Sequence, residues 1–123
     1  MKKTILIADD FENTRWIIEI TLKGIDSIIL KAENGKDALK YFDGRTIDLL
    51  ITDLNMPVMN GIELIKAIKD LPDYATIPVI MLTTDTKPEQ KQQAANLKVT
   101  FWMQKPFKND EFIKVVKKCL GIK

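Results

Sequence analysis

The stretch that decides the fold is Leu50-Ile51-Thr52-Asp53-Leu54-Asn55-Met56-Pro57. Its apolar half predicts a buried strand over residues 47–52, which runs directly into the carboxylate of Asp53. Pro57 and the Asn60-Gly61 pair after it predict a loop, because proline lacks an amide donor and Asn-Gly favours turns. Asp53 is therefore expected at the carboxyl end of a buried strand, where open α/β sheets bind their ligands.

Outward from this stretch, strand and helix patterns alternate along the whole chain. Further apolar runs predict strands at residues 4–8, 27–32, 77–82 and 99–103. Periodic or capped segments predict helices at about 17–25, 37–42, 60–71, 88–97 and 109–120, with capping boxes at Asn60/Glu63 and Thr86/Glu89. Short connections between strand and helix favour a parallel sheet covered on both faces. The sequence predicts one α/β domain over residues 1–123, with a doubly wound, five-stranded parallel sheet.

Composition excludes several function classes. A chain of 123 residues with 46% hydrophobic residues is sufficient for one domain with a core. The net charge of +2 gives no basic field of the kind that binds nucleic acid. Cys119 is the only cysteine, which excludes an internal disulfide, and the first apolar run is too short for a signal sequence or a membrane span. We expect a cytoplasmic, monomeric protein with no output domain.

The carboxyl ends of the predicted strands carry chemically useful side chains. In a parallel sheet these ends share one edge, so the residues that follow the strands are expected to meet there: Asp9, Asp10, Asp53, Asn55, Thr83, Thr84, Asp85 and Lys105. Neighbouring carboxylates repel one another unless a cation lies between them, and oxygen donors suit Mg²⁺. The chain has no histidine, which excludes histidine-based catalysis and metal ligation. These residues predict a magnesium site at the sheet edge.

The same residues suit phosphoryl transfer. An aspartate carboxylate can act as a nucleophile and form an aspartyl-phosphate. Asp53 is the best candidate because it is the lone carboxylate at its strand end, whereas Asp9 and Asp10 form a pair typical of metal ligands. Lys105 and the hydroxyl of Thr83 would stabilise the charge on the transferred group.

Together these motifs resemble the receiver domain of two-component response regulators over the whole chain. The matching residues are Asp9-Asp10, Asp53 with Met56-Pro57 and Gly61, Thr83, and Lys105-Pro106. The resemblance implies a flavodoxin-like fold with strand order 2-1-3-4-5. The segments Asp9-Asp10-Phe11, Thr21-Leu22-Lys23, Asp53 to Pro57 and Met81 to Asp85 look most like the CheY-like, single-domain chemotaxis receivers.

The resemblance also implies roles for individual residues. Asp53 would accept a phosphoryl group from the phosphohistidine of a sensor histidine kinase. Asp10 and Asp53 would bind Mg²⁺ through their side chains, Asn55 through its backbone carbonyl and Asp9 through water. Asn55 and Asp85 would tune dephosphorylation, although Asp85 is equally well explained as a solvated loop acid.

A second group of residues would bind the phosphoryl group and transmit its arrival. Thr83 and Lys105 would contact the phosphoryl oxygens, and the Lys105-Pro106 bond would be cis. Trp102 stands where the family places its switch aromatic, although a role as a core aromatic fits as well. Thr84, where the family usually has a small residue, would narrow access to the acceptor.

The predicted function is that of a response regulator that signals through phosphorylation-dependent protein binding. Chemotaxis with a flagellar motor switch as target is the first expectation. A phosphorelay intermediate that passes the group to a histidine phosphotransfer protein, or a regulator outside motility, remains an alternative. The segment 89–98 is polar and weakly anchored, and is where we expect mobility.

Two other classes of function fit less well. A Mg²⁺-dependent phosphatase working through an aspartyl-phosphate would need a further general acid and a cap, for which no segment is evident. A flavodoxin-like nucleotide binder would need a glycine-rich loop after the first strand, where Asp9-Asp10 stand instead. We therefore expect no enzyme activity beyond the transfer and loss of the chain's own phosphoryl group.

Overall fold

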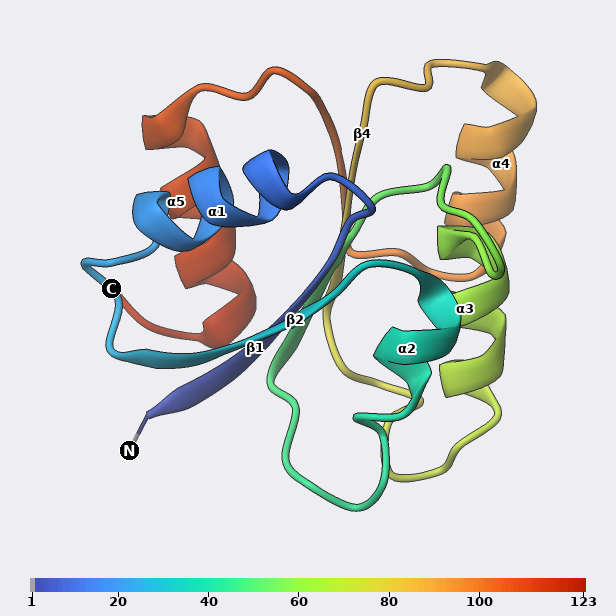
Figure 1. Cartoon of the computed structure of the whole chain (residues 1–123), viewed down its shortest axis with the longest axis horizontal. Helices are drawn as coiled ribbons and strands as arrows, with labels where there is room; N and C mark the ends of the chain where they lie inside the picture. The colour runs from blue at the N-terminus through green and yellow to red at the C-terminus, as the bar shows by residue number, and fades with distance from the viewer. Residues whose placement is uncertain (1) are drawn as a thin grey trace.

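The computed structural model describes residues 2–123 and alternates strand and helix five times (Figure 1). The strands are β1 (Lys3–Ala8), β2 (Ser27–Ala32), β3 (Leu49–Thr52), β4 (Val79–Thr83) and β5 (Phe101–Gln104). The helices are α1 (Glu12–Thr21), α2 (Gly35–Leu39), α3 (Gly61–Lys69), α4 (Pro88–Asn96) and α5 (Asn109–Leu120). Within residues 2–123, no helix has the length and apolar character needed to cross a bilayer.

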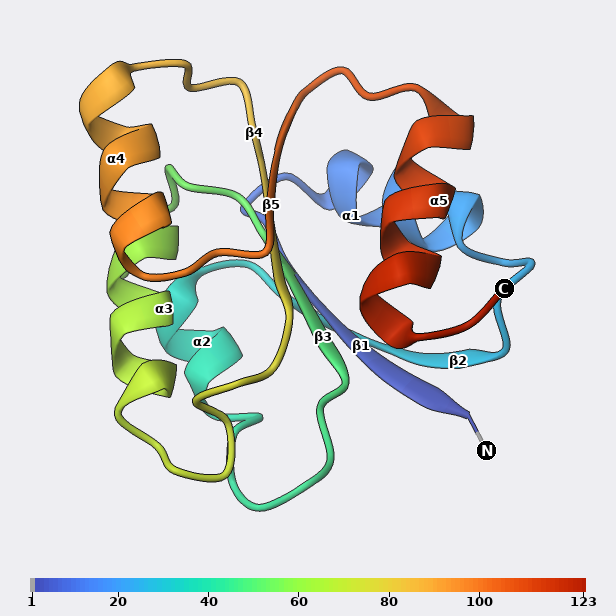
Figure 2. The same ribbon diagram turned by 180° about the vertical axis from the view of Figure 1, so that it is seen from behind.

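All five strands form one parallel sheet in the order β2-β1-β3-β4-β5. Helices α1 and α5 cover one face, and α2, α3 and α4 cover the other (Figures 1 and 2). The predicted doubly wound fold and its strand order are confirmed. Because β3 and β4 are buried along their full length, they read as continuous apolar runs in the sequence.

Alternate side chains of the strands fill two half-cores, one on each face of the sheet. On the α1/α5 face the buried residues include Ile5, Ile7, Ile51, Leu82, Phe112 and Val116. On the α2/α3/α4 face they include Leu6, Leu50, Met81, Leu64, Ile65 and Ala94. Helices therefore pack on both faces of the sheet, and the loops that follow the strands lie at its carboxyl edge.

Several predicted boundaries are wrong by a few residues. Helix α1 spans Glu12–Thr21 rather than 17–25, and α2 spans Gly35–Leu39 rather than 37–42. Strand β3 begins at Leu49 rather than at 47, because its pairing with β1 starts there. β4 begins at Val79 rather than at 77, since Pro78 has no amide to donate. The apolar pattern marks burial, which extends beyond the hydrogen-bonded ladder.

One of the two predicted capping boxes forms. The Asn60 side chain accepts from the Glu63 amide at 2.9 Å, and the Glu63 side chain accepts from the Asn60 amide at 3.0 Å. The Thr86/Glu89 box is wrong: Lys87 is the N-cap residue of α4, and its amide donates to Oδ1 of Asp85 at 2.9 Å. Asp85 binds this backbone from outside the helix.

Candidate functional site

Asp9 and Asp53 are placed by the ends of two adjacent central strands. Asp9 follows β1 and Asp53 follows β3, and their side chains are nearly inaccessible, with residue exposures of 2% and 7%. The Asp53 amide donates to the carbonyl of Ala8 at 2.8 Å, which continues the strand pairing to the carboxylate itself. The sheet therefore fixes both backbones before any ligand binds.

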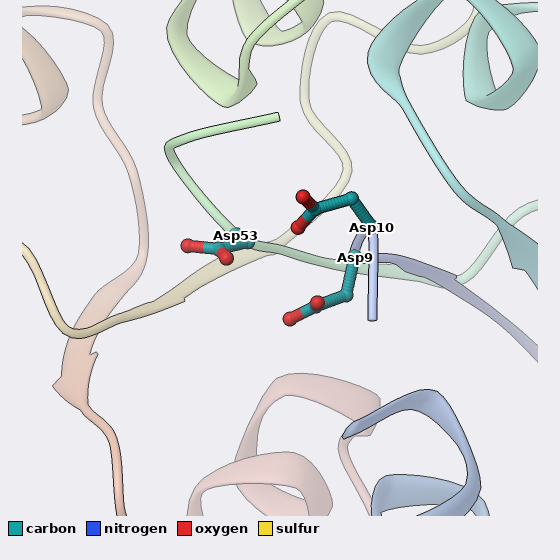
Figure 3. A group of neighbouring side chains, drawn as sticks. All are labelled: Asp9, Asp10 and Asp53. Carbon is teal, nitrogen blue, oxygen red and sulfur yellow. The ribbon is translucent and has the colours of Figure 1, made fainter. Parts of the chain in front are cut away.

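Asp10 completes a cluster of three carboxylates with Asp9 and Asp53 (Figure 3). One oxygen from each lies within 4.8 Å of the other two. The Asp10 Oδ1 atom is buried and has no hydrogen-bond partner among residues 2–123. An orphaned buried oxygen within an all-oxygen donor set fits a hard divalent cation such as Mg²⁺. The predicted cluster is thus brought together as a group that could bind a metal.

Lys105 directly follows β5, an outer strand of the sheet, and its side chain extends to the same cluster. Its ammonium Nζ donates to Oδ2 of Asp9 at 2.9 Å and to Oδ2 of Asp53 at 3.1 Å. Burial opposes the charge on this group, but the hydrogen bonds and negative charges of the two aspartates outweigh it and raise the pKa of Lys105. The ammonium therefore stays charged within contact of the candidate acceptor. The peptide bond to Pro106 is cis, as the resemblance implied.

The pKa of Asp9 reflects its burial and its negatively charged neighbour. Burial raises the pKa of the Asp9 carboxyl above its ordinary 3.8, and the charge of Asp53 acts in the same direction. The Phe11 amide, which donates to Oδ1 at 2.9 Å, and Lys105 offset only part of this effect. A further positive charge near Asp9 would favour its ionised form.

Two loops meet beside the acceptor through a contact that the sequence did not predict. Nδ2 of Asn55, in the β3–α3 loop, donates to Oδ2 of Asp85, in the β4–α4 loop, at 3.1 Å. The Lys87 amide and this Asn55 amide lower the pKa of Asp85. The two residues predicted to tune dephosphorylation thus touch each other. Both readings of Asp85, a tuning residue and a solvated loop acid, stay predictions.

Thr83 and Thr84 differ in environment although they are neighbours. Thr83 ends β4 and is fully buried, and its hydroxyl accepts from the Asp85 amide at 3.1 Å. Thr84 is exposed. Only Thr83 is therefore held by the fold in a fixed position at the sheet edge.

Trp102 packs from β5 against the half-core on the α2/α3/α4 face. The ammonium of Lys91 lies 5.9 Å from the centre of its ring, which connects Trp102 to α4. Its Nε1 atom is buried with no hydrogen-bond partner in the described chain. Trp102 is therefore partly buried against this half-core, and its switch role stays a prediction.

Gly61, one of the residues that match the family pattern, lies against the backbone of the acceptor, a contact that the sequence did not predict. Its amide donates to the Leu54 carbonyl at 2.8 Å, and a Cβ at this position would collide with the carbonyl oxygen of Asp53. The Asn60-Gly61 pair predicts a turn and a helix start, and nothing in that pattern indicates a close approach to the acceptor backbone. The requirement becomes visible only when the loop is folded back on β3.

The sequence comparisons agree with this geometry. The model of the family described as response regulator receiver domain matches residues 5–117. The chain is 36% identical over 104 residues to chemotaxis protein CheY of Pseudomonas aeruginosa, covering 84% of each chain. It is also 34% identical over 118 residues to an uncharacterized 14.6 kDa protein of Leptolyngbya boryana, covering 95% of this chain and 90% of that one.

The same fold occurs in solved structures. Chemotaxis protein CheY4 of Vibrio cholerae superposes with a TM-score of 0.89 at 33% identity, covering 98% of this chain and 100% of that one. A putative response regulator of Chloroflexus aurantiacus gives 0.90 at 28% identity, covering 98% and 99%. With its acidic cluster and its lysine at the strand ends, the chain belongs to the response regulator receiver domain family and is a CheY-like regulator of a two-component phosphorelay.

Proposed function

We propose that Asp53 takes a phosphoryl group from the phosphohistidine of a sensor histidine kinase. The observation that carries this proposal is the position of the Asp53 carboxylate, buried beside two further carboxylates and bound by the Lys105 ammonium. A carboxylate oxygen of Asp53 forms the new bond to phosphorus, the bond from phosphorus to the donor imidazole nitrogen breaks, and that nitrogen keeps the electron pair. The 123 residues contain no histidine, so none of them can be the donor.

Each residue of the cluster has a separate task in the proposed phosphoryl transfer. Leu54 orients the acceptor, since its amide donates to Oδ1 of Asp53 at 2.7 Å. Lys105 moves its ammonium from the carboxylates to the incoming phosphoryl oxygens. Asp9, Asp10 and Asp53, with the backbone carbonyl of Asn55, would hold Mg²⁺. The ion, when bound, would supply positive charge that stabilises the transferred group.

The donor protein would dock on the α1 side of the site. A mainly apolar groove of about 290 Å³ lies there, lined by residues that include Ile17, Lys105, Pro106 and Phe107. Ile17 and Phe11 are 49% and 63% exposed, which is unusual for large apolar side chains beside a charged site. A helical partner could cover them while its histidine faces Asp53.

Output would follow as a change in protein binding. The new negative charge on Asp53 draws Thr83 toward it, and Trp102 connects that movement to α4. Asn55 and Asp85, which bridge the loops beside the acceptor, set how readily water reaches the phosphoryl group, while Thr84 lies at the exposed rim. We favour chemotaxis as the pathway, because relatives from Pseudomonas and Vibrio are named chemotaxis proteins. The target of the regulator is then a flagellar motor switch. The regulator acts in the cytoplasm and as a monomer.

The test is phosphorylation by a small donor. With acetyl phosphate and Mg²⁺ the protein is expected to gain the mass of one phosphoryl group, and Asp53→Asn is expected to abolish that gain because an amide cannot form the acyl phosphate. Intact-protein mass spectrometry measures both. Asp73→Asn, at an exposed carboxylate outside the site, is the matched control and should behave like the parent. Equal labelling of the Asp53→Asn protein would refute the assignment.

The competing phosphatase function predicts a different kinetic result. We expect a single phosphoryl group per chain and no repeated turnover of a phosphomonoester, because the cluster offers no additional general acid besides the carboxylates proposed to hold the cation. Catalytic release of phosphate from a phosphomonoester, lost in the Asp53→Asn protein, would favour the phosphatase.

A further inference from the structure

The loop between β3 and α3, residues 53–60, is fastened at its outer end by α2. The amide of Gly35, the first residue of α2, donates to the carbonyl oxygen of Met59 at 2.9 Å. The first amides of a helix have no partner within the helix, so this donor is available to the loop. The helix is capped separately, because Asn34 accepts from the Asp37 amide at 2.8 Å.

This contact requires glycine at position 35 for reasons of space. A Cβ built there would lie 2.6 Å from the Met59 carbonyl oxygen and 2.8 Å from its Cγ. Both distances are shorter than packed atoms tolerate, and one of the two partners is backbone. Any side chain at position 35 must therefore push Met59 and its loop away from α2.

The loop segment that this contact holds is strained. The Met59 amide donates to the Pro57 carbonyl at 2.7 Å, which closes a three-residue turn around Val58 with a φ of 69°. Positive φ is unfavourable for a β-branched residue, and Val58 is 73% exposed, so packing of its side chain does not stabilise it. Strained backbone persists where the surroundings over-determine it. Here the Gly35–Met59 bond holds one end and the Gly61–Leu54 bond the other.

Asn55 lies between these two anchors. Its carbonyl is the proposed backbone ligand of the cation, and its side chain reaches Asp85. We propose that Gly35 is a positioning residue for the acceptor site: through Met59 it sets the course of the loop and hence the place of Asn55. This inference rests on the proposed function, in which Asn55 faces the cation.

The experiment compares Gly35→Ala with the parent protein, with Mn²⁺ as the spectroscopic probe. Free and bound Mn²⁺, separated by electron paramagnetic resonance, are expected to show about tenfold weaker binding in the variant, the usual effect of losing groups that orient metal ligands. Gly24→Ala is the matched control, because nothing lies within 4 Å of a Cβ built there. It should bind Mn²⁺ like the parent.

A second readout follows the loop without metal. The side-chain amide signals of Asn55 in NMR spectra report its bond to Asp85, and they are expected to shift in Gly35→Ala but not in Gly24→Ala. Val116→Ala, in the half-core on the opposite face, supplies a destabilised protein with an intact loop. The Val116→Ala protein should unfold more easily, yet its Mn²⁺ binding and its Asn55 signals should equal those of the parent.

The outcomes separate this inference from the proposed function. Parent-like Mn²⁺ binding in Gly35→Ala, or an equal loss in Val116→Ala, overturns the positioning role of Gly35. If the parent itself binds no Mn²⁺, the proposed cation site fails, and the Asn55 signals then decide alone. Unchanged Asn55 signals in Gly35→Ala would overturn the inference in that case too.

Discussion

At the scale of single residues, the ammonium of Lys105 lies against the same carboxylates that are proposed to hold the cation. It contacts Asp9 and Asp53 at 2.9 and 3.1 Å. In the absence of a divalent ion this contact is what balances the buried acids. Lys105 and the cation would therefore use the same carboxylate groups, and we expect binding of one to weaken binding of the other.

Removing the ammonium should make the fold depend on the cation. Lys105→Met leaves Asp9 and Asp53 without their partner, and we expect the free energy of unfolding without divalent ions to fall by about 1–3 kcal/mol. Added Mg²⁺ should restore more stability to this variant than it adds to the parent. Urea unfolding with and without Mg²⁺ measures both quantities.

The control for this experiment is Lys114→Met, at an exposed position of α5. Its stability and its response to Mg²⁺ should equal those of the parent. An identical gain from Mg²⁺ in the Lys105→Met and parent proteins would contradict competition between the ammonium and the ion.

Sequence reasoning succeeds in placing residues that directly follow a strand. Asp53 and Lys105 are of this kind, because an apolar run that stops at a charge predicts the place of that charge in a parallel sheet. The Asn55–Asp85 bond and the Gly35–Met59 bond are not, since each joins a loop to a segment that is distant in the sequence. Their partners depend on how the loops bend in space, which local composition does not encode.

At the scale of elements, α4 is packed much less firmly than α3. Ala94 is its only buried residue, whereas α3 buries five residues along one stripe. The turn after α4 places Lys98 in the left-handed region with a φ of 60°. The helix is thus weakly anchored along its length and strained where it ends.

Relieving that strain should stabilise the protein. In Lys98→Gly the left-handed conformation no longer costs the roughly 1 kcal/mol that a side chain adds, and the free energy of unfolding should rise by about that amount. Urea denaturation measures it. Lys98→Ala is the control, since it removes the lysine head but keeps the Cβ that makes a positive φ unfavourable, and should gain nothing. A destabilised Lys98→Gly protein would show that the Lys98 side chain contributes more than the strain costs.

At the scale of the whole molecule, two half-cores share one sheet. Strands β1, β3 and β4 send alternate side chains into each, so neither half-core can come apart while the other keeps its strands in place. Helices α3 and α5, on opposite faces, are therefore parts of one cooperative unit. Helix α4 contributes little to either half-core.

Native-state hydrogen exchange should reflect this arrangement. We expect the slowest amides of α3 and α5 to exchange with the same opening free energy, equal to that of global unfolding, and those of α4 to exchange with a smaller one. The predicted mobility of residues 89–98 would appear in the same measurement. Amides of α4 that are protected as strongly as those of α3 would contradict both expectations.

Strand β1 starts and helix α5 finishes at the edge of the sheet where the strands begin (Figures 1 and 2). The backbone amide of Lys3 donates to the carbonyl of Asp26, just before β2. Helix α5 starts near the edge that carries the acidic cluster and runs back toward the edge where the strands begin. The carboxylates of Asp9, Asp10 and Asp53 are at the opposite edge. A fluorescent protein or an affinity handle joined at either end would thus leave the acceptor open, so that phosphorylation can be followed on tethered molecules at a surface.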